Sequence, residues 1–153
     1  MPPKTELQHH KEVTKWLKRN YPKMIFRTDY SAGLKLTIGQ AKTHYALQSG
    51  RAYPDLWIAQ PVGVYHGLYL ELKKDGEKII LNDGTLTKDK HIREQAKVLE
   101  DLARLGYAAA FAVGHTQAKQ IIKDYLAGQA IHPVIYQFVD HVKEHGGDEE
   151  LPF

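Results

Sequence analysis

The stretch that decides the fold is YPDLWIAQPVGVYHGLYLELKK, residues 53–74. It covers two apolar, strand-like runs, of which the first, 52–59, begins one residue earlier and the second is 67–74; a loop that contains proline and glycine joins them. If the runs form a hairpin in which Asp55 pairs with Glu71, the connecting loop has seven residues, a plausible length. Both acids then project from one face of the sheet, with Cβ atoms about 4.5–5.5 Å apart.

Two carboxylates held this close repel each other, so the pair favours a bound cation. Oxygen ligands from Asp55 and Glu71 suit Mg²⁺ or Mn²⁺, and the backbone carbonyl of Leu72 offers a further oxygen. Lys73 projects from the same face, where it can steady an activated water or a phosphate oxygen. At this point a second interpretation stays open, in which the hairpin face is solvated and carries an ordinary Glu–Lys pair.

Three polar residues fall on faces of helices that otherwise point inward. Glu6 and His10 lie on the apolar arc of a helix predicted over 5–19, and Gln95 lies on the apolar arc of a helix predicted over 88–106. Glu6 also fits a helix-start residue favoured by the helix dipole, and Gln95 fits a polar residue satisfied at the edge of the core. For His10, local packing is favoured over a role at the site. Such a convergence of polar side chains is easier to explain as a site than as independent accidents.

The rest of the chain predicts an α/β fold (an α+β mixed sheet) flanked by helices. Further predicted elements are a strand over 23–30, a short helix over 40–50, a tight turn at 82–84, a buried strand over 107–114, and helices over 115–128 and 134–145. We divide the chain into a domain over 1–130 and a C-terminal helical extension with an acidic tail over 131–153.

Composition excludes several classes of protein. The 153 residues include no cysteine, so disulfides and thiolate metal sites are impossible. No apolar run approaches the length of a membrane span, and the polar amino terminus lacks a signal peptide, so we expect a cytoplasmic protein. The net charge of +3 is a mild indication of a polyanionic partner.

The motif PD at 54–55 followed by ELK at 71–73 matches the PD-(D/E)XK nuclease signature. The flanking segments resemble VRR-NUC domains: the opening helix with its acid, the "G…PDL" and "ELK" strands, and the helix that carries Gln95. The resemblance covers roughly residues 5 to 127 and is strongest to the small stand-alone proteins of phages and bacteria. It implies a restriction-endonuclease-like αβββαβ core in a bacterial or phage-infected cell.

The resemblance also implies Mg²⁺- or Mn²⁺-dependent hydrolysis of DNA, often branched DNA such as Holliday junctions or flaps. Carried over, Glu6, Asp55 and Glu71 are metal ligands, Lys73 is the catalytic lysine, and Gln95 lies near the site. Affinity for DNA would come from cations that contact phosphates; the candidates are Lys35, Lys42, Arg51, Lys74, Lys88, Lys90 and Arg93. Symmetric cleavage of a junction would suit a homodimer. A non-catalytic DNA-binding or scaffolding module and a restriction-type duplex nuclease are the alternatives.

The carboxyl terminus, GDEELPF, is similar to the acidic tip of bacterial single-stranded DNA-binding proteins. That similarity implies a host repair protein as a partner of Leu151, Pro152 and Phe153, while a disordered solubilising tail is the alternative. His141 and His145 have a possible zinc spacing without an obvious third ligand, which favours a solvated helix face.

Overall fold

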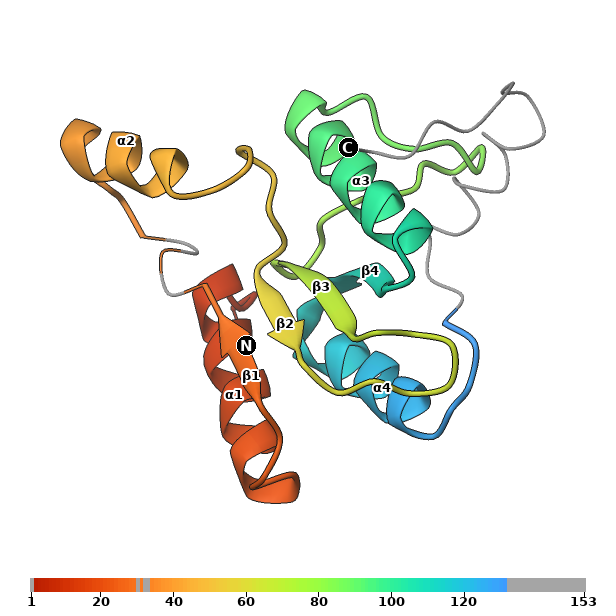
Figure 1. Cartoon of the computed structure of the whole chain (residues 1–153). Coiled ribbons are helices and arrows are strands. Elements are labelled where there is room, and N and C mark those ends of the chain that lie inside the picture. Colours follow the sequence, from red (N-terminus) through yellow and green to blue (C-terminus); the bar gives the residue numbers. More distant parts are fainter. Residues whose placement is uncertain (1, 30, 32–33, 132–153) are drawn as a thin grey trace.

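The computed structural model describes residues 2–29, 31 and 34–131, which form a four-stranded sheet and four helices (Figure 1). In chain order the elements are α1 (Glu6–Asn20), β1 (Phe26–Thr28), α2 (Ile38–Ala46), β2 (Leu56–Ile58), β3 (Leu68–Lys73), α3 (Lys90–Arg104), β4 (Ala108–Val113) and α4 (Gly114–Leu126). The predicted mixed α+β architecture is confirmed, and no helix within these residues is long and apolar enough to cross a membrane.

The sheet has the strand order β1-β2-β3-β4, with antiparallel pairs β1–β2 and β2–β3 and a parallel pair β3–β4. The parallel pair needs a crossover, and α3 supplies it. In the hairpin, Leu56 pairs with Leu70 and Ile58 pairs with Leu68. Continued by one residue, this register sets Asp55 opposite Glu71, as the sequence predicts.

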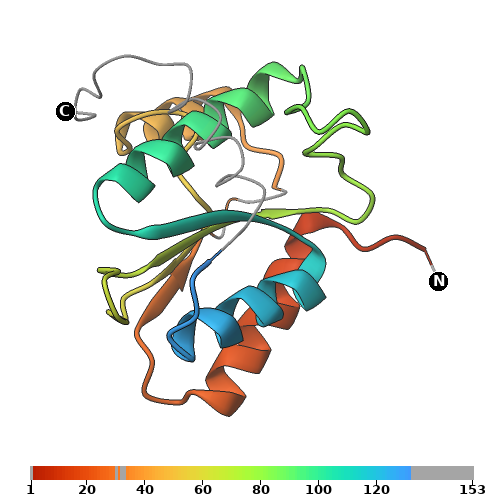
Figure 2. The same ribbon diagram turned by 90° about the vertical axis from the view of Figure 1, so that its right-hand side faces the viewer.

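The helices cover both faces of the sheet. Figure 2 shows α3 on one side and α1 with α4 on the other. Leu68, Leu70 and Leu72 are fully buried, as expected for alternate residues that face a core. Glu71 and Lys73, which point to the opposite face, are also buried, at 2% and 6% exposure. The solvated-hairpin interpretation is therefore wrong.

Local sequence signals fix the ends of the helices that frame the site. Thr5 caps α1 in a capping box with Gln8, which confirms the predicted start. After α3 the chain turns at Gly106, where φ is +94° and an added Cβ would lie 2.7 Å from the His66 ring. Glycine suits this position because it adopts positive φ without a steric penalty.

The predicted helix over 40–50 is found as α2, which starts two residues earlier. Thr37 and Gln40 form a second capping box at its start, and its last helical residue is Ala46 rather than a residue next to Gly50. None of its residues is buried, and it extends away from the sheet in Figure 1. The predicted turn at 82–84 is present, with Gly84 at a φ of +83°.

Several sequence predictions lie outside the described residues. They are the helix over 134–145 with His141 and His145, and the acidic tail with Leu151 to Phe153.

Candidate active site

Asp55 directly precedes β2 and is held from both neighbouring strands. Its backbone carbonyl accepts a hydrogen bond from the Asp29 N–H at 2.7 Å, and its Oδ2 accepts one from the Leu72 N–H at 3.1 Å. Its side chain is only 10% exposed. Because the N–H and C=O of one strand residue point to the same side, we expect the Leu72 carbonyl to face Asp55 as well.

Glu71 and Lys73 are joined through one amide. The Gln95 Nε2 donates to Glu71 Oε1 at 2.7 Å, and the Gln95 Oε1 accepts from Lys73 Nζ at 2.5 Å. The Lys73 Nζ also lies 3.7 Å from Glu71 Oε1, within the range of an ion pair. Gln95 is itself 5% exposed and projects from α3 toward the sheet. The amide thus fixes the orientation of both charged groups.

The acids of the site disfavour one another's charged forms. Burial raises the pKa of Glu71 well above its ordinary value, the charge of Asp55 adds to this rise, and Lys73 opposes it. Burial also raises the pKa of Glu6, again with a contribution from Asp55. The arrangement therefore concentrates negative charge that a divalent cation would neutralise.

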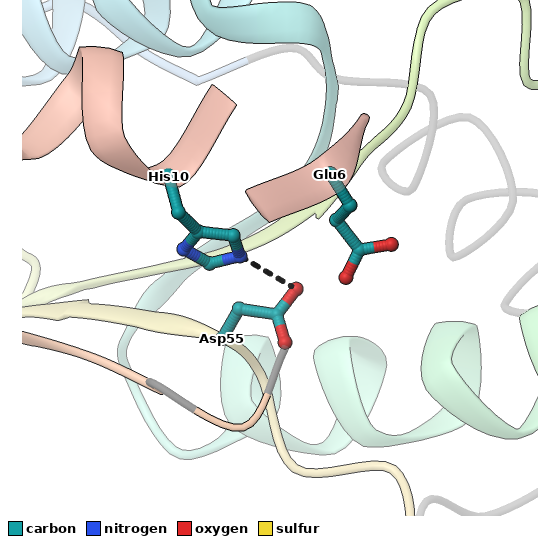
Figure 3. Close-up of side chains that lie close together, drawn as sticks. All are labelled: Glu6, His10 and Asp55. Atoms are coloured by element: carbon teal, nitrogen blue, oxygen red, sulfur yellow. Dashed lines mark ion pairs between the residues drawn. The ribbon is translucent and has the colours of Figure 1, made fainter. Parts of the chain in front are cut away.

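Glu6 and His10 approach Asp55 from successive turns of α1 (Figure 3). One ligand atom from each of the three residues lies within 4.8 Å of the others. The His10 Nε2 is 3.7 Å from Asp55 Oδ2, which is too long for a hydrogen bond, and within the described parts of the chain this buried nitrogen has no hydrogen-bond partner. The His10 Nδ1 contacts the Thr28 hydroxyl.

These residues fit a divalent metal ion. The carboxylates of Glu6 and Asp55 and a buried imidazole nitrogen without a hydrogen bond lie together, and Glu71 is close enough to Asp55 for the two acids to repel each other. Hard oxygen donors suit Mg²⁺ and Mn²⁺, and imidazole suits transition-metal ions. Glu6, Asp55, Glu71 and the Leu72 carbonyl are the ligands that the sequence predicts.

Two histidines at this site receive little weight from the sequence. Helical spacing put His10 inward, but a single buried histidine more often packs than binds. His91 lies one turn before Gln95, and its Nε2 is 3.1 Å from the Gln95 Nε2. The one sequence signal that could have placed His91 near the site is its i, i+4 spacing from Gln95. That signal is useful only once Gln95 is known to face the site.

The candidate DNA-binding cations divide into two groups. One surface hollow of about 1060 Å³ is lined by Arg51, Lys88, Lys90 and Arg93, together with Lys97, which is not among the predicted DNA-binding residues. Arg93 is fixed there, since its Nε donates to the Thr87 carbonyl at 2.9 Å. The remaining candidates, Lys35, Lys42 and Lys74, are exposed and lie outside this hollow.

The described residues form an α+β domain in which Asp55, Glu71, Lys73 and Gln95 lie close together. No protein-family model and no curated protein matches the sequence. A solved structure described as a VRR_NUC domain protein is similar over 82% of this chain and 91% of its own, with 27% identity and a TM-score of 0.58. This likeness supports a nuclease domain of the VRR-NUC type in this chain, and the PD and ELK residues are consistent with the PD-(D/E)XK group.

Proposed function

We propose that this protein is a metal-dependent DNA endonuclease that hydrolyses phosphodiester bonds, with selectivity for branched DNA. The observation that carries the proposal is the burial of Glu71 and Lys73 beside Asp55. Buried charges are costly, and packing alone does not require them on this face of the sheet. A catalytic role for these three residues explains why the chain keeps them.

Each side chain has a definite task in this proposal. Asp55, Glu71, Glu6 and the Leu72 carbonyl would hold Mg²⁺ or Mn²⁺, with Asp55 kept in place by the Leu72 N–H. The bound ion supplies Lewis-acid polarisation of the scissile phosphate and activation of water. Lys73 places a positive charge where negative charge develops on the phosphate and so stabilises the transition state.

Gln95 acts as the positioning residue. Its amide oxygen accepts from Lys73 and its amide nitrogen donates to Glu71, so it fixes the spacing between the cation and the acid. Residues that orient the groups in contact with a metal commonly contribute about 10–100-fold to activity or affinity.

The basic hollow offers a path for the DNA backbone. Its cations come from α3 and from the segments that precede α3 and β2, the same segments that carry Gln95 and Asp55. Lys90 begins α3, the helix that also supplies Gln95. Phosphate contacts of this kind position a duplex without reading its sequence, and their affinity falls with salt.

The finer features of this proposal come from the sequence. Branched substrates and a homodimer follow from the family resemblance and from the two symmetric cuts that a junction requires. A role for 131–153 as an extension that recruits a host repair protein through Leu151 to Phe153 follows from the acidic tip. Deletion of these three residues should weaken binding of that partner or change basal cleavage, and the recruitment idea fails if neither changes.

The test of the proposal is cleavage by the full chain of a four-way junction, a flap and a linear duplex, with Mg²⁺, Mn²⁺ or EDTA. We expect divalent-dependent cleavage that favours the branched substrates. Binding of DNA without cleavage would assign a scaffolding role instead. Cleavage of duplex at a defined sequence would assign a restriction-type nuclease, and cleavage in EDTA would overturn the metal-dependent mechanism.

A further inference from the structure

We propose that His10 is a nitrogen ligand of the metal ion held by Glu6 and Asp55, and that it tunes this site toward transition-metal ions over Mg²⁺. The inference rests on the proposed function, because it concerns the same acids. It adds a residue and a metal preference that the acids alone do not imply.

The burial of His10 needs an explanation. The residue is 3% exposed, and its Nε2 has no hydrogen-bond partner within residues 2–29, 31 and 34–131. At 3.7 Å from Asp55 Oδ2 this nitrogen is within ion-pair range but forms no hydrogen bond. A buried polar atom that lacks a hydrogen bond costs about 1–3 kcal/mol, so such atoms are rare unless they bind something. Figure 3 shows this nitrogen directed at the carboxylate of Asp55, with the Glu6 carboxylate beside it.

The spacing of the donor atoms suits one ion. Ligands that each lie about 2.1 Å from a metal are separated by about 3.0 Å at right angles and about 4.2 Å across the ion. The 3.7 Å between His10 Nε2 and Asp55 Oδ2 falls between these limits. The three donors lie within 4.8 Å of one another, so binding of one ion needs a contraction of at most about 0.6 Å below that bound.

The opposite ring nitrogen holds the imidazole in the required orientation. His10 Nδ1 contacts the Thr28 hydroxyl on β1. When Nδ1 donates its proton to this oxygen, the lone pair of Nε2 faces the acids, which is the arrangement that orients a ligating histidine in other metal sites. Thr28 therefore acts as a positioning residue for His10.

The chemical consequence is a change in selectivity. Mg²⁺ prefers oxygen donors, whereas imidazole favours first-row transition-metal ions, and Mn²⁺ accepts both types of ligand. We therefore expect His10→Gln to weaken Mn²⁺ binding by about 10-fold or more, the scale for perturbing a metal's ligand set. The affinity for Mg²⁺ should change much less, because that ion gains little from the nitrogen.

The decisive experiment is pulsed electron paramagnetic resonance of the full chain with Mn²⁺, without DNA or turnover. Unlabelled wild type should show the ¹⁴N modulation of a directly bound imidazole. In wild type labelled with ¹⁵N-histidine, the ¹⁵N pattern should take its place. His10→Gln should lose the modulation, and His44→Gln, on α2 and outside the acidic cluster, should keep it. Calorimetric titration of the same proteins with Mn²⁺ and Mg²⁺ measures the selectivity.

The outcomes separate the two proposals. Tight Mn²⁺ binding with no nitrogen coupling in wild type would overturn the role of His10 and leave the nuclease proposal standing. Failure of wild type to bind either ion would overturn both. Because the absence of nitrogen coupling in labelled wild type already overturns the role of His10, a variant that fails to fold does not remove the test.

Discussion

Replacement of Glu71 by glutamine should stabilise the protein in the absence of divalent ions. Glutamine keeps the size of the side chain and an oxygen that can accept from Gln95 Nε2. It removes a buried negative charge that Asp55 repels and whose pKa burial raises. If Glu71 is retained for metal binding at the expense of stability, Glu71→Gln should be more stable than wild type. If Glu71 serves as a structural ion pair, the variant should be less stable.

The size of the effect follows from terms that partly cancel. Lys73 lies 3.7 Å from Glu71, and an attraction at about 4 Å is worth about 4 kcal/mol at an effective dielectric constant near 20. The paired position of Asp55 gives a repulsion of similar order. What remains is the cost of desolvating Glu71, which is several kcal/mol and is reduced by the hydrogen bond from Gln95. We expect a net gain of about 1–2 kcal/mol, which raises Tm by about 2–8 °C in a chain of this size.

The gain should depend on pH with a definite sign. The folded pKa of Glu71 lies above its unfolded value of 4.5, so the folded state binds the proton more tightly. The wild-type protein therefore loses stability as pH rises from about 4.5 through the raised pKa, and bears the full cost above it. The advantage of Glu71→Gln should be largest at neutral pH and vanish below about pH 4.5.

Thermal unfolding of both proteins in EDTA, from pH 4 to 8, measures this difference. Glu100→Gln is the matched control, since Glu100 is equally buried on α3 but pairs with Arg104 away from the acids. That variant should lose stability because it leaves Arg104 without this partner. A lower Tm for Glu71→Gln at neutral pH, or a gain that persists at pH 4, would refute the reasoning.

Three further changes test other parts of the structure. Gln95→Leu should reduce the single-turnover cleavage rate by about 10–100-fold, and an unchanged rate would remove its positioning role. Lys90→Glu should weaken DNA binding and lower the slope of log affinity against log salt concentration by about one. The same change at the exposed Lys18 on α1 should do neither, and fluorescence anisotropy at several salt concentrations measures both variants. Asp75→Asn should lower Tm at neutral pH but not in acid, because contacts with the Lys4 N–H and His9 hold the pKa of Asp75 below its ordinary value; equal Tm values at pH 7 would contradict this.

The core of the fold could be predicted from the sequence because its signals are local. The alternating leucines of 67–74 set the face of β3, and the length of the loop set its register with β2. Capping residues such as Thr5 located helix starts. The end of α2 was harder to predict, since that helix buries no residue and packing therefore does not fix its length.

The site could be predicted in part, for a different physical reason. Asp55 and Glu71 meet through strand pairing, which has a fixed period that the sequence displays. The bridge through Gln95 depends on how α3 packs on the sheet, and the approach of His10 depends on how α1 meets the end of β2. Such contacts between elements have no local pattern, so helical wheels gave the direction of these side chains but not their partners.

The central claim is that Asp55 is essential to a metal-dependent nuclease, and one comparison tests it directly. Asp55→Asn keeps an oxygen that can accept from the Leu72 N–H and removes the charge needed to bind an ion. With Mn²⁺ and a labelled four-way junction, single-turnover cleavage by Asp55→Asn should be slower than that of wild type by at least about 100-fold, while both proteins bind the DNA. Equal rates for the two proteins would contradict the account.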